Sequence, residues 1–253
     1  MATTTQVSSL GRSQFYLYMS LSLLATAIIG FFNTYIQPLA LGTFKGQTIL
    51  HIHGAVFFGW FIFYAVQNWL VASGRTRIHR EVGLLGIALA TAMFFTVMIT
   101  TTVRINYFEA LGFGEQIRIF SWVQVGGILF FISLFTLAIL SIRNPETHKR
   151  LMLLATISLM DAPIARILAV FLLPPPPPGF IGPPPVMAAV IGGLGACVFL
   201  IWAVIHDWRT RGRPHSVYLY GGAAFILLQL TRIPISETGM WMKISTMIGN
   251  LGH

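Results

Sequence analysis

Long apolar runs alternate with short polar turns along almost all of this 253-residue chain. A helix rises about 1.5 Å per residue, so about 20 apolar residues cross the hydrocarbon core of a bilayer. The pattern predicts seven membrane-spanning helices, at residues 15–42, 50–71, 83–103, 117–142, 149–173, 186–206 and 216–233. Little chain remains between them, so we expect an all-helical membrane bundle that forms one domain over residues 1–253.

Composition supports the assignment to the membrane. The chain is 55% hydrophobic and 9% charged, with a mean hydropathy of +0.76, whereas soluble proteins have about 25% charged residues. The apolar run after residues 1–14 is too long for a signal peptide and lacks a cleavage site, so it is expected to stay as the first helix. A single cysteine, Cys197, leaves neither a disulfide framework nor a thiolate metal site.

The positive charges mark one side of the bundle. Three alternate loops hold most of them: Arg75, Arg77 and Arg80; Arg143, Lys149 and Arg150; Arg209, Arg211 and Arg213. By the positive-inside rule, the amino terminus is then cytoplasmic and the carboxyl terminus outside. Topology therefore explains the net charge of +9 better than a nucleic-acid partner does, and the lipid bilayer is the expected partner.

The same three loops resemble one another: RTRIHREVGLLG at 75–86, NPETHKRLMLLA at 144–155 and RGRPHSVYLYGG at 211–222. In each, a histidine follows a polar turn and opens the next helix, which predicts three similar hairpins at 50–103, 117–173 and 186–233 after the leading helix. These histidines, His79, His148 and His215, either satisfy the helix start at the interface or bind a cofactor. The second role is possible because the positive end of a helix keeps an imidazole neutral and able to ligate.

Polar side chains within the spans gather in the half away from these loops, the expected outer half. Asp161, 13 residues beyond His148, should lie about 20 Å from the inner surface. A carboxylate at that depth is costly and indicates function. Its nearest partner in sequence is Arg166, and Pro163 should loosen the helix between them. The Asp161 and Arg166 pair is either structural or catalytic, with the carboxylate exchanging protons or contacting a ligand.

Two further features lie in the expected outer half. His51 and His53 form an HxH pair that suits zinc or copper. On a helix the two rings point about 200° apart, so they share one metal only if the segment is not helical. The proline-rich segment LPPPPPGFIGPPPV, at 173–186, predicts a semi-rigid cap over the outer side or a contact with another membrane subunit.

The segments HIHG, GRTRIHREVG, ETHKRLMLLA and DWRTRGRPHSVYLYGG resemble a group of uncharacterised multi-pass bacterial inner-membrane proteins over most of the chain. The resemblance implies a location in the bacterial inner membrane and carries no activity. There is a looser likeness to b-type cytochromes, whose histidines near the ends of adjacent helices ligate haem. In that likeness, His79 and His148 would hold one haem.

These features lead to a redox or cofactor-binding protein of membrane electron transfer as the main hypothesis. Haem b or a quinone is the favoured cofactor, and quinol oxidation releases protons that a histidine or aspartate can accept. Two alternatives stay open, a small-solute transporter or channel using Asp161 and Arg166 and a non-catalytic subunit of a larger membrane complex. The sequence leaves open whether the protein is an enzyme.

Several classes are disfavoured by the motifs that the sequence lacks. P-loop, HExxH, GxSxG and CxxC patterns are missing, which argues against an ATPase, a zinc protease or a serine hydrolase. A retinal protein needs a lysine in the middle of its last span, and residues 216–233 contain none.

Overall fold

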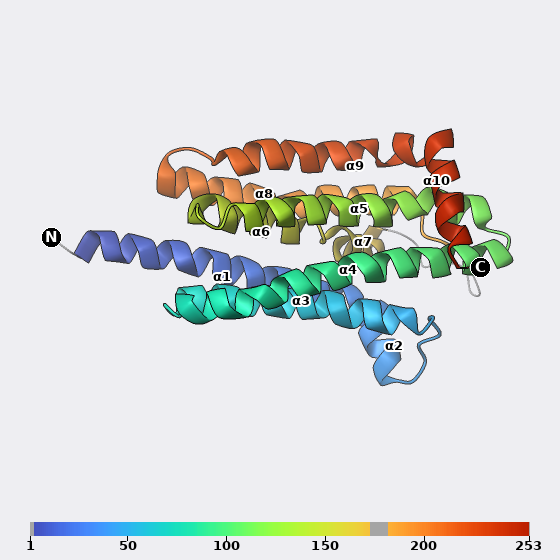
Figure 1. The fold of residues 1–253 in the computed structure, drawn as a ribbon, viewed down its shortest axis with the longest axis horizontal. Coiled ribbons are helices and arrows are strands. Elements are labelled where there is room, and N and C mark those ends of the chain that lie inside the picture. Colours follow the sequence, from blue (N-terminus) through green and yellow to red (C-terminus); the bar gives the residue numbers. More distant parts are fainter. Residues whose placement is uncertain (1–2, 173–181, 253) are drawn as a thin grey trace.

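A computed structural model describes residues 3–172 and 182–252 of the chain, with the side chains of residues 14–171 and 182–252. Within these ranges the chain forms helices joined by short turns and no strand, and the long helices run side by side (Figure 1). The elements are α1 (Thr3–Phe31), η1 (Phe32–Ile36), α2 (Gln37–Ala40), α3 (Ile49–Ala72), α4 (Thr76–Ala110), α5 (Gly114–Leu140), α6 (Pro145–Ile157), α7 (Asp161–Leu172), α8 (Val186–Arg211), η2 (Val217–Gly221), α9 (Gly222–Ser236) and α10 (Gly239–Asn250).

The structure confirms the long apolar helices that the sequence predicted for a membrane bundle. Six segments of the described chain are long and apolar enough to cross a bilayer: Gln14–Ala40, Ile49–Ala72, Thr76–Ala110, Gly114–Leu140, Val186–Arg211 and Val217–Ser236. The predicted span at 149–173 is different. It consists of α6 and α7, which pass the same test only as a pair and are bent by 43°. The described chain therefore has six candidate membrane spans, and the bent pair α6 and α7 is either a broken span or a re-entrant segment.

Pro163 explains why α6 and α7 are separate helices. Proline has no N–H to continue the helical ladder, and its ring excludes the carbonyl one turn earlier, so the preceding helix must stop. The structure ends α6 at Ile157 and begins α7 at Asp161, with Pro163 in its first turn. The sequence predicted only a loosened helix, whereas the structure has a complete break. Distances counted along a continuous helix from His148 to Asp161 therefore do not apply.

The two ends of the bundle differ in charge. The turns α3–α4, α5–α6 and α8–α9 gather at one end (Figure 1), which we call the basic end because the three arginine-rich loops of the sequence lie there. The opposite end carries the α4–α5 turn and α10, and we call it the α10 end. Helix α10 was not predicted from the sequence, and it lies across the long helices at this end.

Packing inside the bundle depends on aromatic contacts and on close helix approaches. Trp60 is fully buried and meets the rings of Phe131 and Phe135 edge-on, at centroid distances of 4.9 and 5.6 Å. Gly30 of α1 lies directly against the backbone of Pro163 in α7. Large apolar side chains such as Leu84 and Leu140 instead point outward. This arrangement is expected in lipid, where helices associate through close packing and small residues rather than through hydrophobic burial.

The polyproline segment is only partly covered. Residues 173–181 lie outside the described chain, and with them most of the predicted cap. Residues 182–185 are not helical, and Pro185 precedes α8 in an extended conformation, with φ −69° and ψ 146°. Helix α8 therefore begins where the prolines end.

Candidate functional site

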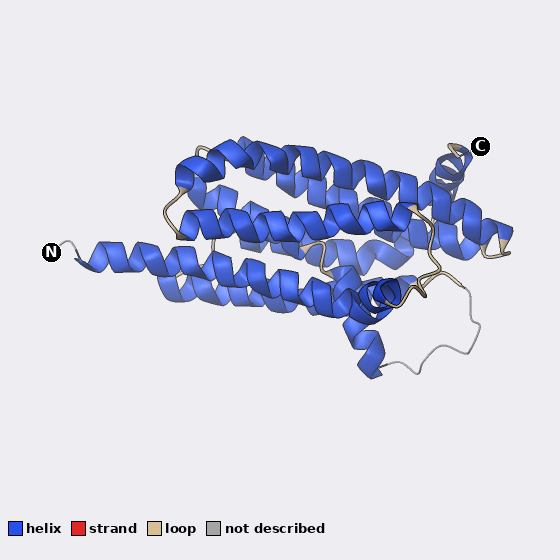
Figure 2. Ribbon diagram, turned by 90° about the horizontal axis from the view of Figure 1, so that it is seen from below, coloured by secondary structure: helices blue, strands red, loops and turns tan. Residues whose placement is uncertain are grey.

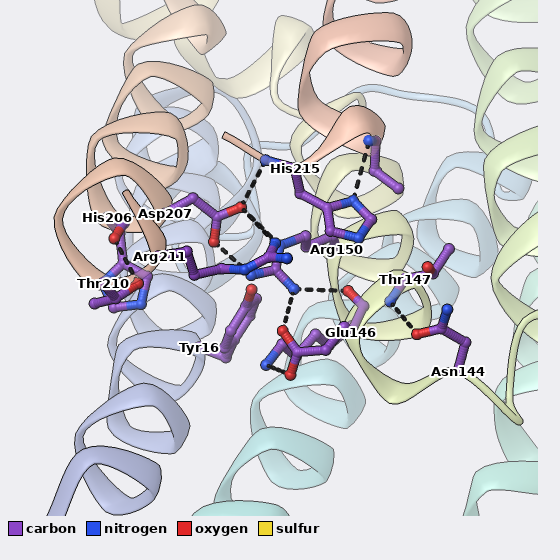
Figure 3. Close-up of polar contacts among 12 residues, drawn as sticks. Tyr16, Asn144, Glu146, Thr147, Arg150, His206, Asp207, Thr210, Arg211 and His215 are labelled. Atoms are coloured by element: carbon purple, nitrogen blue, oxygen red, sulfur yellow. Dashed lines mark hydrogen bonds and ion pairs between the residues drawn. The ribbon is translucent and has the colours of Figure 1, made fainter. Parts of the chain in front are cut away.

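The basic end holds a buried network of charged side chains around Arg150 (Figure 3). Two nitrogens of its guanidinium donate to the carboxylate of Asp207, Nε to Oδ2 at 2.8 Å and Nη2 to Oδ1 at 2.5 Å. A third nitrogen, Nη1, donates to Glu146 Oε2 at 2.7 Å. The backbone N–H of His215 donates to Asp207 Oδ2 at 3.1 Å. The side chains of Arg150 and Asp207 are only 3% and 1% exposed, so this is an ion pair inside the protein.

Local structure places these groups. Asn144 caps α6 by accepting the N–H of Thr147 at 3.2 Å, and Pro145 follows at the first helical position, which is where proline fits. Glu146 and Arg150 then lie one turn apart on the same face of α6. On the other side, Gly212 ends α8 with φ +73°. That conformation, which glycine adopts easily, turns the chain back so that the N–H of His215 reaches Asp207.

Aromatic rings enclose the network. Tyr16 of α1 places its hydroxyl 3.5 Å from that of Tyr218 in η2, and Lys149 Nζ lies 5.1 Å from the centre of the Tyr16 ring. Arg150 lies over the ring of Tyr218 at 5.9 Å. The network therefore joins α1, α6, α8 and η2. Since its central charges are paired and hydrogen-bonded, its evident role is to hold these four elements together.

The three histidines proposed for cofactor binding have different surroundings. His215 is part of this network, and its Nδ1 accepts the N–H of Val217 at 3.2 Å. Burial, and then the positive charges of Arg150 and Arg211, hold the pKa of His215 below its ordinary value of 6.5. His148 Nδ1 lies 2.8 Å from the carbonyl oxygen of Ala138. His79 is close enough to His148 for the two imidazoles to interact electrostatically, and its buried Nδ1 has no hydrogen-bond partner.

Asp161 pairs with Arg232 of α9, 71 residues away, and not with Arg166 as the sequence suggested. Arg232 Nη2 donates to Asp161 Oδ2 at 2.6 Å, and its Nη1 donates to the carbonyl oxygen of Ala189 at 3.0 Å. The Arg232 side chain is 1% exposed and that of Asp161 15%. The pairing with Arg166 fails for a geometric reason. Five residues correspond to about 140° around a helix, so Asp161 and Arg166 point to different sides.

Arg166 and the histidines of α3 lie elsewhere in the same half. Arg166 lies over the ring of Phe31 at 4.4 Å and donates to the carbonyl oxygen of Ala162 at 2.9 Å. His51 Nδ1 is 3.0 Å from the hydroxyl of Tyr35, which belongs to η1. His53 lies against Phe57, and its buried Nδ1 has no partner. Both histidines are helical, so the extended segment that one shared metal would require is not formed.

A fully buried amide lies next to the Asp161–Arg232 pair. Gln229 is 0% exposed, and neither atom of its amide has a hydrogen-bond partner among the described residues. It fits there because Gly193 of α8 has no side chain, and a Cβ atom at that position would overlap the Gln229 amide oxygen. Glycine at 193 is therefore required by close approach.

We expect Gly193→Ala to lower the free energy of unfolding by about 1–3 kcal/mol, the usual cost of overpacking. Gly83→Ala is the matched control, because a Cβ at Gly83, also within a helix, meets nothing within 4 Å. It should be neutral or stabilising, since alanine favours a helix over glycine. Unfolding in mild detergent, followed by tryptophan fluorescence, compares them. Equal stability of the two variants would contradict the close approach.

Two surface grooves have an apolar character. One, of about 250 Å³, is lined by Leu17, Leu21, Ala65, Val66 and Trp69 of α1 and α3. The other, of about 170 Å³, is lined by Ile87, Phe135, Thr136, Ile139 and Leu140 of α4 and α5. Asp161 and Arg150 line neither groove. The described residues also contain no group of three or more His, Cys, Asp or Glu side chains arranged to hold a metal ion.

The chain matches no protein-family model, no curated protein and no solved structure. Any function must therefore be argued from its own side chains. Sequence reasoning missed the Arg150–Asp207 pair, since Arg150 was counted as a marker of topology. A single acidic residue at the end of an apolar span was the available signal for Asp207.

Proposed function

We propose that this protein binds a small redox cofactor or its substrate within the membrane, with its basic end in the cytoplasm and Asp161 as the proton-exchanging group. The observation that supports this most is the Asp161–Arg232 ion pair, which lies at the break between α6 and α7 in the interior of an apolar bundle. Ionisable groups at such depth are costly and belong by default to a functional site.

The surroundings of Asp161 support proton exchange. The Arg232 side chain is buried. Its guanidinium donates hydrogen bonds to the carboxylate of Asp161 and to the carbonyl oxygen of Ala189. Asp161 retains some exposure, and its Oδ1 accepts the N–H of Ala162 at 2.6 Å. Arg232 fixes the position of the carboxylate, which is still reachable, so within this proposal Asp161 is the group placed to accept a proton when a quinol is oxidised. Within this proposal, quinone is therefore the cofactor that we expect to bind at the α10 end, near Asp161.

Haem, if bound, would be held by His79 and His148 at the basic end. A backbone carbonyl at the Nδ1 of His148 fixes the tautomer that leaves Nε2 as a ligand. His79 lies within electrostatic range of His148. His215 is left out of this proposal because its ring nitrogen already caps the start of η2. When bound, haem would supply one-electron transfer.

The test is a pair of absorption spectra, oxidised and dithionite-reduced, of protein purified in mild detergent, together with extraction and chromatography of bound quinone. We expect a quinone to co-purify. A b-type spectrum, if present, should be lost in His79→Ala and His148→Ala but kept in His215→Ala. A preparation with neither quinone nor haem absorption after membrane extraction under gentle conditions would overturn the redox proposal.

Transport of a small solute is a second candidate, favoured by the 43° bend between α6 and α7. Broken helices at the membrane midplane form the substrate sites of many transporters, and the positive end of a half-helix faces the substrate. Asp161 is the first residue of α7. In a Cys197→Ser background, Ala162→Cys should then react with an impermeant maleimide from both sides of the membrane. Labelling from one side or neither contradicts alternating access.

A further inference from the structure

Four arginines lie in the half of the bundle next to α10, and two of them lack an acidic partner. Arg232 pairs with Asp161, and Arg118 pairs with Glu109. Among the described residues, no carboxylate forms an ion pair with Arg104 or Arg166. Cations in the hydrocarbon region cost about 2.5–3.5 kcal/mol each on insertion scales unless they are compensated. This half therefore has two excess positive charges.

Aromatic rings hold both of these arginines in place. The guanidinium of Arg104 lies over Phe108 at 5.0 Å, and that of Arg166 lies over Phe31 at 4.4 Å. Arg166 also donates to the carbonyl oxygen of Ala162, in the preceding turn. A ring on one face of a guanidinium orients it and leaves its edge donors available. The two side chains are thus fixed in position without being neutralised.

The two arginines are brought together around His53. They come from different helices, Arg104 from α4 and Arg166 from α7, and His53 comes from α3. Both arginines are close enough to His53 and to each other for their charges to interact, and Arg166 is also within range of the Asp161 carboxylate. Phe31 links α3 to α7, because its ring meets Phe58 of α3 at 5.8 Å as well as carrying Arg166. All three helices reach the half of the bundle next to α10 (Figure 1), and Figure 2 shows the same bundle of long helices from below.

Hydrogen-bonding groups at this site remain unpaired. Arg104 Nε and His53 Nδ1 are buried and have no partner among the described residues. Buried polar groups are normally satisfied, so each unpaired one requires an explanation. Two guanidinium groups, one of which has an unpaired buried N–H, beside an imidazole are a set of groups that can bind phosphate or carboxylate oxygens. The same charges would repel a metal cation at His53.

We propose that Arg104, Arg166 and His53 form a binding site for an oxyanion, a phosphate or carboxylate group, either on a free small molecule or on an anionic lipid headgroup. This inference rests on the proposed function in one respect, since it places the ligand in the same half of the bundle as Asp161. It adds that the ligand carries a negative charge. In this proposal His53 faces an anion, whereas the sequence led us to expect a zinc or copper ion at His51 and His53.

The experiment uses purified protein in mild detergent and measures its unfolding temperature by tryptophan fluorescence. Inorganic phosphate is titrated in one arm and phosphatidylglycerol in mixed micelles in the other, with chloride at equal ionic strength as the reference. A rise in unfolding temperature with phosphate identifies a free anion as the ligand. A rise in unfolding temperature only with phosphatidylglycerol identifies a lipid headgroup. No rise in either arm would overturn the inference.

Arg104→Gln and Arg166→Gln should each weaken this stabilisation by about tenfold or more in ligand concentration, because one charge-assisted hydrogen bond contributes about 1.5–3 kcal/mol. Arg77→Gln is the matched control, since that side chain is 91% exposed and pairs only with Glu81. Equal stabilisation of the wild type and both variants by the anion would also overturn the inference.

The ligand-free variants separate binding from a structural role. If Arg104 and Arg166 repel each other in the empty site, either glutamine variant should unfold at the same temperature as the wild type or higher. A structural arginine would instead unfold lower when replaced, and that result contradicts the inference. Failure of both anion arms while quinone co-purifies leaves the proposed function intact. An anion effect without quinone or haem overturns the redox proposal alone.

Discussion

Asp207→Ala is expected to lower the free energy of unfolding by about 3–5 kcal/mol, because two nitrogens of the buried Arg150 guanidinium lose their acceptors and Glu146 alone remains as a carboxylate partner. Arg150 is 2% exposed and Asp207 0%, so water cannot replace the lost contacts. The variant also removes the acceptor for the N–H of His215. Detergent-solubilised protein titrated with denaturant and followed by tryptophan fluorescence measures the change.

Two companion variants give this prediction its controls. Glu81→Ala breaks the exposed Arg77–Glu81 pair, whose side chains are 91% and 59% exposed, and should cost less than about 1 kcal/mol. The double variant Arg150→Leu with Asp207→Leu removes both charges and should recover much of the loss, since an apolar replacement of a buried pair is often tolerated. A similar small effect of Asp207→Ala and Glu81→Ala would show that the network does not hold the bundle together.

Asp161→Ala should also cost about 3–5 kcal/mol, because Arg232 is 1% exposed and keeps only the carbonyl of Ala189 as a partner. Arg166→Ala should cost less, since among the described residues Arg166 forms no ion pair and its guanidinium donates to the carbonyl of Ala162 in its own helix. The comparison separates the pairing found in the structure from the one that sequence distance suggested.

A double-mutant cycle measures this difference directly. The coupling between Asp161 and Arg232 should exceed about 1 kcal/mol, and that between Asp161 and Arg166 should be smaller, because those two interact only at longer range. Asp161→Asn keeps a hydrogen-bond acceptor for Arg232, and it should therefore be more stable than Asp161→Ala. Larger coupling to Arg166 than to Arg232 would reject the structural assignment.

Much of the candidate site was visible in the sequence as single residues. Asp161 and Arg166 stood out because polar residues in apolar spans are rare, and the three helix-opening histidines because they follow basic turns. What the sequence did not contain was their partners. Asp161 was assigned to Arg166, five residues away, whereas its partner is Arg232.

The sequence by itself determined that this is an all-helical membrane protein, where its apolar helices run, and where the basic turns and helix-opening histidines lie. Hydropathy and the need to satisfy each backbone hydrogen bond within one segment are local properties of the chain. The break before α7, the helix α10 and the ion pairs were decided by the tertiary structure. Arg150 meets Asp207 across 57 residues and Arg232 meets Asp161 across 71, because the relative rotation and depth of packed helices, which no local pattern specifies, select the partner of each buried charge.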